Sequence, residues 1–481
     1  MRILIVFSII CLAACAAEKK IVCYFGSWSV YRPGNGKFDI GDVDPTLCTH
    51  LIYTFVGWNG NDVKVLDPWN DLPNGLDGFG RFNALRKKSP SIKTLVAIGG
   101  WNEGSLKYSK MASNQKSRER FADRAVAFVK KWGFDGFDLD WEYPNQRGGS
   151  AKDVKNFVEL VKVLKQRFDK EGLILSAAVA AAESSASKSY DIAEMSKYLD
   201  FINLMAYDFH GAWEPTTGLN APLHAAASDS YEARGLNSEA AVKYWLSKGA
   251  PREKLILGVP TYGHSFTLAN PRSYGIGAAS SGKGAAGPYT QQIGMLGYNE
   301  ICEMQKNGGW KVNYDEERQA PWAHKDRQWI GFDNIKSIKA KAEFAKQLGL
   351  GGAMVWSIET DDFRGICGEK YPLLKTLKAV LLNGEEVSRD QDTVDNNEVP
   401  NEVDEPNNSD DSTPTDNKPR PLPLTTIGNC QAEEPAALPG TCDFVMCSSN
   451  HRGGYYETPM KCPKFLCFNP TARICDWPRR D

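Results

Sequence analysis

Eight short apolar segments, rich in β-branched residues, recur along residues 18–385 and alternate with helical patterns. The segments are 21–25, 50–56, 94–98, 134–139, 173–179, 201–205, 255–259 and 352–355. In the stretch before the fourth segment, for example, Phe121, Ala125 and Phe128 recur at helical spacing. Strands joined by helical crossovers pair in parallel, and eight of them can close on themselves. The pattern predicts an α/β fold, a (β/α)8 TIM barrel.

The stretch between the seventh and eighth segments is much longer than one crossover needs. It contains glycine-rich turns and further strand-like pieces at 263–268 and 328–332. We therefore expect an inserted α+β subdomain at about 261–345, which would form one wall of a groove.

Two regions beside the predicted barrel have the composition of unfolded or processed segments. Residues 1–17 combine Arg2, an apolar run and small residues, which is typical of a secretory signal peptide cleaved after Ala16 or Ala17. Residues 386–428 are acidic and rich in Pro, Ser and Thr, which predicts a disordered linker. We expect a secreted, extracellular protein.

Residues 429–481 contain six cysteines and are too few to form a stable core without cross-links. An even number of cysteines in a secreted chain makes disulfide bonds the expected state. This region therefore predicts a small disulfide-rich β module.

Composition and charge argue against several classes of partner. The net charge of −2 over 481 residues provides no basic field for nucleic acid. No apolar run beyond the signal peptide is long enough to span a bilayer. The sequence also has no phosphate-binding glycine loop and no helical pair of metal ligands. We expect a monomer with no cofactor, no metal, and neither nucleic acid nor membrane as partner.

Residues 135–144 read DGFDLDWEYP and place four acids in or beside a predicted buried strand. Because strand side chains alternate, Asp138, Asp140 and Glu142 face the barrel lumen, whereas Asp135 has the opposite parity and is expected to be structural. Three neighbouring carboxyls cannot all ionise cheaply, so we expect a raised pKa near the mouth of the barrel. A carboxylic acid still protonated near neutral pH suits general acid catalysis of glycoside cleavage. A buried, hydrogen-bonded acid cluster or a cation site is the alternative.

The segment FDGFDLDWEYP, 134–144, resembles the signature of family 18 glycoside hydrolases, the chitinases. Other segments similar to that family are KTLVAIGGW (93–101), MAYDFHG (205–211), GVPTYG (258–263) and GGAMVWSIETDDF (351–363). The resemblance implies an endochitinase that hydrolyses internal β-1,4 linkages, with chitin and chito-oligosaccharides as partners. The alternatives are a catalytically weak chitin-binding lectin, a structural matrix protein, or an endo-β-N-acetylglucosaminidase acting on N-glycans.

The same resemblance implies roles for individual residues. Glu142 would protonate the glycosidic oxygen while the substrate's own N-acetyl oxygen attacks the anomeric carbon, with retention. Asp140 would orient the acetamido group, Asp138 would pair with Asp140 and modulate its proton, and Tyr207 would hydrogen-bond the acetamido carbonyl. Residues implied to contact the sugar chain are Tyr24, Trp28, Gly100, Trp101, Tyr143, Met205, Asp208, Trp213, Tyr262 and Trp356.

Five other polar residues lie in or beside these motifs. His264 stands where many relatives have arginine, and Glu359 stands where aspartate is usual, which bears on subsites and pH optimum. His210 is expected to be structural or to touch substrate, because the mechanism needs no histidine. Asp361 and Asp362 are expected to be local hydrogen-bond partners at the end of the last strand.

The C-terminal segment CPKFLCFNPTARICDWP resembles a chitin-binding type-2 module of the peritrophin kind. The two resemblances imply a set of disulfides: Cys23–Cys48 and Cys302–Cys367 in the barrel, and Cys430–Cys447 and Cys462–Cys475 in the tail. Cys467 is extra to the pattern and is a suggested partner for Cys442. Candidate sugar-stacking residues in the tail are Tyr455, Tyr456, Phe465 and Trp477, for which core packing is the alternative.

Overall fold

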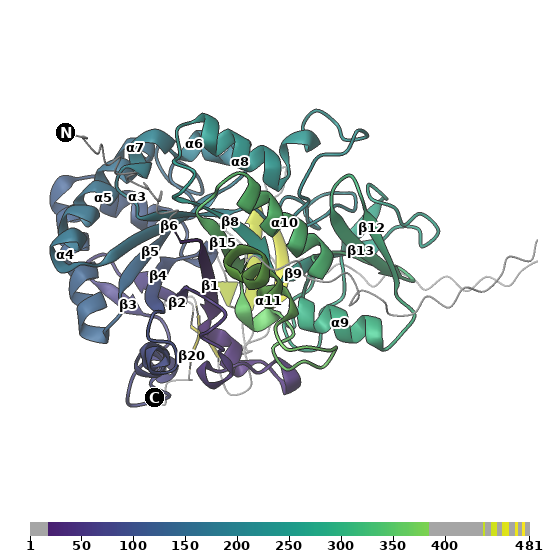
Figure 1. Cartoon of the computed structure of the whole chain (residues 1–481), viewed down its shortest axis with the longest axis horizontal. Helices are drawn as coiled ribbons and strands as arrows, with labels where there is room; N and C mark the ends of the chain where they lie inside the picture. Colours follow the sequence, from purple (N-terminus) through teal and green to yellow (C-terminus); the bar gives the residue numbers. More distant parts are fainter. Residues whose placement is uncertain are drawn as a thin grey trace, which may run out of the picture. The chain divides into compact units, whose positions relative to one another are not determined.

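The computed structural model describes residues 18–383 and, beyond them, the backbone of five short strands between 436 and 476. Eight parallel strands form its centre: β1 (Lys20–Gly26), β2 (His50–Trp58), β4 (Lys93–Gly99), β5 (Gly136–Asp140), β6 (Ile174–Ala180), β7 (Phe201–Met205), β8 (Leu255–Pro260) and β15 (Gly352–Trp356). They pair in the order β1-β15-β8-β7-β6-β5-β4-β2, and β1 also pairs with β2, which closes the barrel (Figure 1). The predicted (β/α)8 barrel is confirmed, and its strands are the eight segments expected from the sequence.

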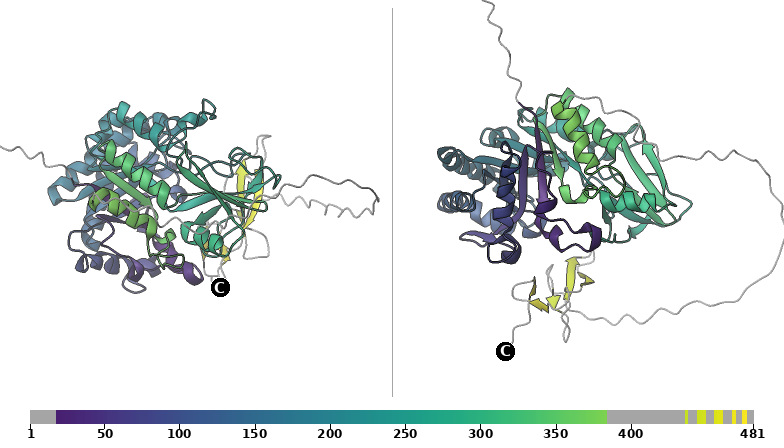
Figure 2. Two further views of the ribbon diagram at one scale, coloured as in Figure 1. Left: turned by 45° about the vertical axis from the view of Figure 1, so that its right-hand side comes forward. Right: turned by 60° about the horizontal axis from the view of Figure 1, so that its bottom comes forward.

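Helices cover the outside of this barrel (Figures 1 and 2). They are α1 (Pro68–Asp71), α2 (Gly78–Asn83), α3 (Leu106–Ala112), α4 (Gln115–Trp132), α5 (Asp153–Phe168), α6 (Glu183–Ser189), α7 (Ile192–Ser196), α8 (Ser238–Ser247), α10 (Ile335–Gln347) and α11 (Pro372–Lys378). In α4 the Asn114 side chain caps the first turn by accepting a hydrogen bond from the Ser117 amide, and Gly133 in the left-handed conformation ends the helix. None of the helices in residues 18–383 has an apolar stretch long enough to cross a membrane.

The alternation of strand side chains divides the buried interior into two layers. Phe137 and Leu139 of β5 point outwards and pack with helix side chains such as Phe121 and Phe157. The lumen is filled by a separate cluster that includes Tyr24, Tyr207, Tyr262 and Met354. The lumen side chains of β5 are therefore held among aromatic rings rather than against the helices.

The predicted α+β insertion is confirmed between β8 and β15. Its strands are β9 (Tyr262–Leu268), β10 (Ser280–Lys283), β11 (Met295–Gly297), β12 (Lys311–Asp315), β13 (Ala320–Lys325) and β14 (Gln328–Gly331), with helix α9 (Tyr298–Lys306). The antiparallel sheet has the order β10-β9-β14-β13-β12, with β11 added beside β9. It lies on one side of the barrel, to the right in Figure 1. A buried ion pair between Asp333 and Lys341 lies where the chain leaves the insertion for α10.

Both disulfides expected in the barrel region are present. Cys23–Cys48 joins β1 to the segment before β2, and Cys302–Cys367 joins α9 to the segment after β15. A short strand, β3 (Val63–Val65), pairs antiparallel with the end of β2. Because β9 continues directly from the end of β8, the insertion begins at the mouth of the barrel.

The tail forms a second unit of the chain. Strands β16 (Ala436–Ala437), β17 (Phe444–Ser449) and β18 (Tyr455–Met460) pair antiparallel, as do β19 (Cys467–Asn469) and β20 (Ile474–Asp476). The side chains of this unit, with its expected disulfides and aromatic residues, lie outside the described part of the structure, as do the signal peptide (1–17) and linker (386–428). These expectations remain predictions.

Candidate active site

Asp138 lies at the bottom of the acid column and is held by three side chains from β1, β6 and β7. The Tyr24 hydroxyl donates to its Oδ2 at 2.7 Å, the Ser176 hydroxyl to its Oδ1 at 2.6 Å, and the Asn203 amide to the same Oδ1 at 3.2 Å. Burial raises the pKa of Asp138 to about 6, although these hydrogen bonds favour the ionised form and limit the rise. The carboxyl is therefore fixed in one orientation in the lumen.

Asp140 is buried above Asp138. Burial, the charge of Glu142 and then the charge of Asp138 raise the pKa of the Asp140 carboxyl well above its usual range. Its Oδ1 has no hydrogen-bond partner within residues 18–383, and no hydrogen bond there joins Asp140 to Asp138. Asp140 therefore presents an unused polar atom in the lumen, and its surroundings favour the protonated form of its carboxyl.

Glu142 lies two residues beyond β5, at the mouth of the barrel. Burial raises the pKa of its carboxyl to about 7. A hydrogen bond with Tyr143 and the positive charge of Arg147 work against this rise, whereas the negative charge of Asp208 adds to it. A carboxyl with this pKa can both donate and accept a proton at neutral pH.

Arg147 is a site residue that the sequence analysis missed. Its Nη1 donates to the backbone oxygens of Trp101 at 2.9 Å and of Glu142 at 3.0 Å. Its guanidinium carbon lies 3.5 Å from the centre of the Trp101 ring. Arg147 thus ties the loop that carries Glu142 to an exposed aromatic ring. The only sequence signal was a basic residue five positions after the glutamate.

Asp208 follows β7, and its negative charge acts on Glu142. The Tyr262 hydroxyl donates to its Oδ1 at 2.5 Å, and the His264 Nε2 lies 2.7 Å from the same oxygen. The ring of Trp213 meets His264 edge-on at 5.0 Å between centroids. The ring of Tyr262 also meets His264 edge-on, at 5.8 Å. His264, one of the two departures from the family pattern, therefore contacts three of the expected sugar-binding residues.

Aromatic rings surround the top of the lumen. Trp356 lies 5.4 Å from Tyr24, 6.2 Å from Trp28 and 5.8 Å from Phe55, measured between ring centroids. Phe55, which the sequence analysis did not single out, also stacks on Trp28. A Cβ at Gly100 would come within 2.8 Å of the Phe55 ring, so only glycine fits there. These residues come from the ends of β1, β2, β4 and β15, so the barrel brings them together.

The remaining predicted residues also lie at the mouth. Tyr207 is buried in the lumen cluster with its hydroxyl 3.7 Å from the sulfur of Met354, and the partly buried Met205 packs on the same cluster. Tyr143 is partly buried, and its carbonyl accepts a hydrogen bond from Ser105. The exposed rings are those of Trp28, Trp101 and Trp213.

Other polar residues in the motifs are paired with groups outside the acid column. Glu359 is fully buried and accepts hydrogen bonds from the Gly26 amide at 3.1 Å and the Ser357 hydroxyl at 2.5 Å. Asp361 accepts from the Leu374 amide and Asp362 from the Cys367 amide, as expected for local partners; His210 pairs with Glu214, and Asp135 pairs with Arg86.

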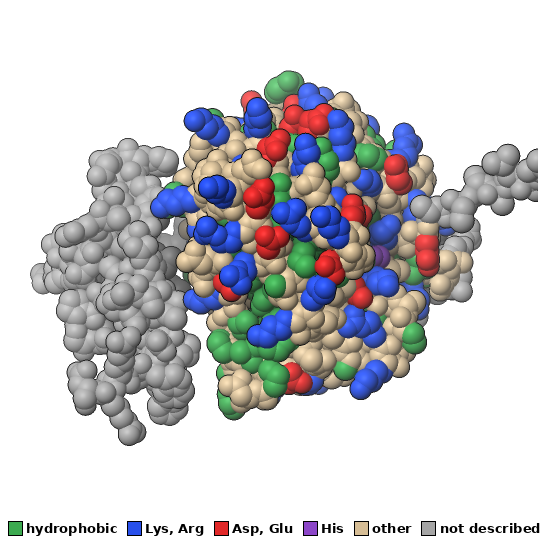
Figure 3. Space-filling view, turned by 90° about the vertical axis from the view of Figure 1, so that its left-hand side faces the viewer, with side chains coloured by type: hydrophobic (Ala, Val, Ile, Leu, Met, Phe, Trp, Pro, Cys, Tyr) green, Lys and Arg blue, Asp and Glu red, His purple; other side chains and the backbone are tan. Residues whose placement is uncertain are grey.

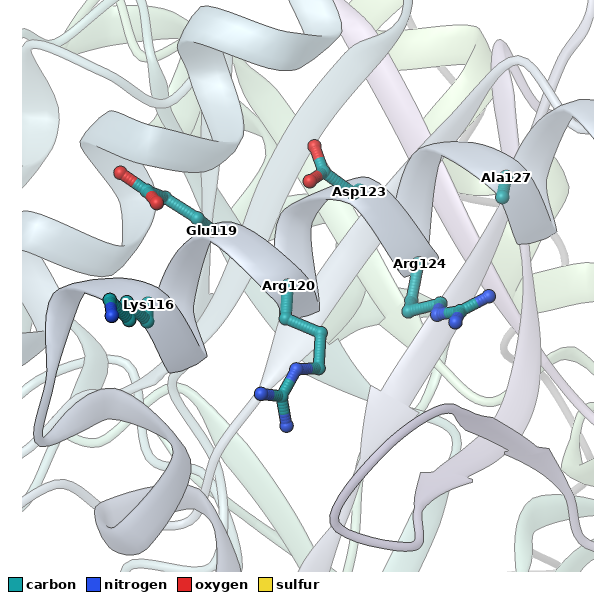
Figure 4. A pocket seen from close by; sticks show the side chains of 6 residues that line it. All are labelled: Lys116, Glu119, Arg120, Asp123, Arg124 and Ala127. Carbon is teal, nitrogen blue, oxygen red and sulfur yellow. The ribbon is translucent and has the colours of Figure 1, made fainter.

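Two further features of the described residues lie apart from this site. Cys302, Cys367 and Asp362 are close enough to hold a metal, but the two cysteines are joined to each other. A hollow on the outside of α4 is lined by Lys116, Glu119, Arg120, Asp123, Arg124 and Ala127 (Figure 4). Around it, basic and acidic side chains are interspersed over the face of the molecule that carries α4 (Figure 3). Neither feature contains a residue of the acid column.

A family model, related sequences and solved structures all match the part of the chain that contains this site. The model of glycosyl hydrolases family 18 matches residues 20–361. The chain is 38% identical to chitotriosidase-1 of Mus musculus in an alignment of 472 residues, and the match covers 95% of each protein. It resembles the Group IV chitinase of Ostrinia furnacalis, solved with allosamidin, with a TM-score of 0.75 and 45% identity over 77% of this chain and 100% of that one.

Human YKL-39, a pseudo-chitinase with retained chitooligosaccharide binding, is also similar in structure. Its TM-score is 0.71, with 41% identity over 76% of this chain and 100% of that one. The family therefore contains both enzymes and a binding protein at comparable similarity to this chain. The family model, the barrel and the acid column agree with the resemblance seen in the sequence, and the chain belongs to family 18 of the glycosyl hydrolases.

Proposed function

We propose that the protein is a secreted endochitinase that hydrolyses internal β-1,4 linkages between N-acetylglucosamine units. The observation that carries the proposal is the complete acid column, in which Glu142 at the mouth has a pKa of about 7 above the buried Asp140 and Asp138. A group that must give up a proton and later take one back works best when its pKa lies near the working pH.

The reaction proceeds in two steps. Glu142 donates its proton to the glycosidic oxygen as the substrate's acetamido oxygen attacks the anomeric carbon from the other face. The leaving chain departs with its new hydroxyl, and an oxazolinium ion remains. Water then attacks the same carbon and gives its proton to Glu142, so the configuration is retained. The protein supplies no nucleophile and needs no cofactor for this reaction.

The other lumen residues position the acetamido group. The unpartnered Oδ1 of Asp140 is available to accept its N–H, which prepares the carbonyl oxygen for attack. The Tyr207 hydroxyl makes only a weak contact with sulfur and is available to donate to the carbonyl oxygen. Burial, the charge of Glu142 and then the charge of Asp138 raise the pKa of Asp140, so Asp138 adds to the preference of its neighbour for the protonated form.

Attack within the polymer requires sugar-binding surfaces on both sides of Glu142. The exposed ring of Trp28 follows β1, that of Trp101 follows β4, and that of Trp213 follows β7. The flat faces of such rings pack against the axial C–H groups of sugars. Rings around the mouth therefore allow an internal linkage to lie over Glu142.

The similarity to YKL-39 favours one alternative, a chitin-binding protein without turnover. Release of a fluorophore from a labelled chitotrioside distinguishes the two, with Glu142→Gln as the matched variant. We expect turnover by the wild type and a loss of about 10²- to 10⁴-fold in the variant, because general acid catalysis has that range. No wild-type turnover together with retained oligosaccharide binding would favour the binding protein.

Secretion and a chitin-binding tail belong to the same proposal. The two disulfides in residues 18–383 fit an oxidising compartment. A tail that binds the polymer would raise the local concentration of the enzyme on an insoluble substrate. Expression in a secretory host tests this part, since we expect the mature chain to begin after residue 16 or 17 and to bind chitin beads.

A further inference from the structure

Four aromatic rings stack in sequence within the insertion. Tyr274 lies on His324 with 4.0 Å between centroids and 11° between planes. His324 stacks on Trp322 at 5.7 Å, and Trp322 stacks on Trp329 at 5.7 Å. The Trp329 indole also donates to the Tyr274 carbonyl at 2.9 Å, which pins the loop that carries the tyrosine.

Tyr274 is the outermost ring of this stack. Trp329 is fully buried and His324 nearly so, whereas Tyr274 is 40% exposed. Because one face of the tyrosine ring lies flat on His324, its exposed surface lies on the opposite face and the ring edge. Burial and the nearby charge of Lys311 lower the pKa of His324, so the ring beneath Tyr274 is uncharged at neutral pH.

The stack lies on the same face of the insertion sheet as His264. The strand register places His264 opposite Gly331 and Gly331 opposite Trp322, and the next row of that face contains Phe266, Trp329 and His324. The two rows are about 7 Å apart along the strands. Since His264 contacts Asp208 and Trp213, this face continues outwards from the candidate active site.

We propose that the open face of Tyr274 is a saccharide-binding platform that takes units of an N-acetylglucosamine chain extending past Trp213. The inference rests on the proposed function, because it assigns to the same site a longer contact with the polymer. A sugar ring presents C–H groups that pack on an aromatic face. The stacked rings beneath hold that face in place before binding, so little conformational entropy is lost on association.

The surroundings favour a sugar over a protein partner. The exposed apolar residue Val312 lies on β12, the strand beside that of His324. Because Val312 pairs with Ala323, it faces the other side of the sheet. One exposed ring is too small for a stable protein interface, which needs hundreds of Å² per partner. Lys311 is opposite His324 in the register and is exposed, so it can donate hydrogen bonds to sugar hydroxyls.

Affinity electrophoresis of the full chain through gels containing soluble glycol chitin tests the platform without requiring turnover. The variants are Tyr274→Ala, Tyr274→Phe and, as the matched control, Tyr231→Ala, whose ring is 91% exposed but has no part in the stack. We expect the Tyr274→Ala affinity to fall about 2- to 10-fold, the range of one aromatic contact. Tyr274→Phe and Tyr231→Ala should bind like the wild type, and all should cleave a labelled chitotrioside equally.

Equal retardation of Tyr274→Ala and Tyr231→Ala by the glycol chitin gel would refute the proposed saccharide-binding platform. So would a parallel loss of chitotrioside turnover in Tyr274→Ala, because it would mean that the active site itself had been disturbed. The tail is identical in all variants and cancels in the comparison. A wild type that is retarded but does not cleave the trioside would refute the proposed hydrolysis alone, and the contrast at Tyr274 would still decide the platform.

Discussion

Removing the positive charge of Arg147 should extend the activity of the protein towards alkaline pH. Burial sets the pKa of Glu142 at about 7, and Arg147 holds it below the value that burial and Asp208 would otherwise produce. Glu142 must be protonated to act as the acid. In Arg147→Gln its pKa should rise, and the fall of kcat/KM at high pH should move to higher pH.

The size of the effect follows from the protonated fraction of Glu142. With a pKa of about 7, half of the enzyme carries the proton at pH 7 and about one-tenth carries it at pH 8. Above pH 8 the rate is therefore proportional to that small fraction. Arg147 is exposed, so solvent screens its interaction with Glu142 to about 1 kcal/mol. Losing this interaction corresponds to an about fivefold gain in kcat/KM at pH 8 to 9.

The assay is kcat/KM for a labelled chitotrioside between pH 5 and 9. Arg147→Lys is the control: it keeps the charge but loses the planar contact with Trp101, so KM changes while the position of the alkaline fall does not. Asp208→Asn should move the fall to lower pH, because the Asp208 charge raises the pKa of Glu142. A fall that stays in place in Arg147→Gln, or moves to lower pH, would refute the electrostatic account.

Two further predictions concern buried groups and are measured as the free energy of unfolding in urea. Tyr24→Phe removes a hydrogen bond to the Asp138 carboxylate and should cost about 1 to 3 kcal/mol at pH 8. Since the folded-state pKa of Asp138 is about 6, the cost should shrink at pH 5, and equal costs at both pH values would contradict this. Lys341→Met leaves the fully buried Asp333 without its counter-charge and should cost about 3 to 5 kcal/mol. The additional change Asp333→Leu should recover part of that loss, and no recovery would show that packing, not charge, is responsible.

Much of the fold could be predicted from the sequence because it depends on local periodicity. The eight barrel strands are apolar and β-branched, and the segments between them have helical spacing. The direction of the acid column follows from the same rule, since Asp138 and Asp140 share a parity and lie in the lumen, while Phe137 and Leu139 lie outside. These features require no knowledge of distant residues.

Contacts between distant segments could not be predicted in this way. The partners of Asp138 include Tyr24, 114 residues earlier, and the partners of Glu359 include the amide of Gly26. The guanidinium of Arg147 finds the Trp101 ring only because the loops after β4 and β5 lie side by side. No spacing in the sequence contains these pairings, because they depend on how the barrel closes.

The sequence by itself determined the barrel, the insertion, the two barrel disulfides suggested by resemblance, and which acids share one face. Only the tertiary structure decided how far the pKa of each acid is shifted, which rings surround the acid column, and that Tyr274 stacks on His324. The physical reason is one of range. The direction of a side chain depends on its own strand, whereas its pKa and its stacking partners depend on burial and on groups brought close by the whole fold.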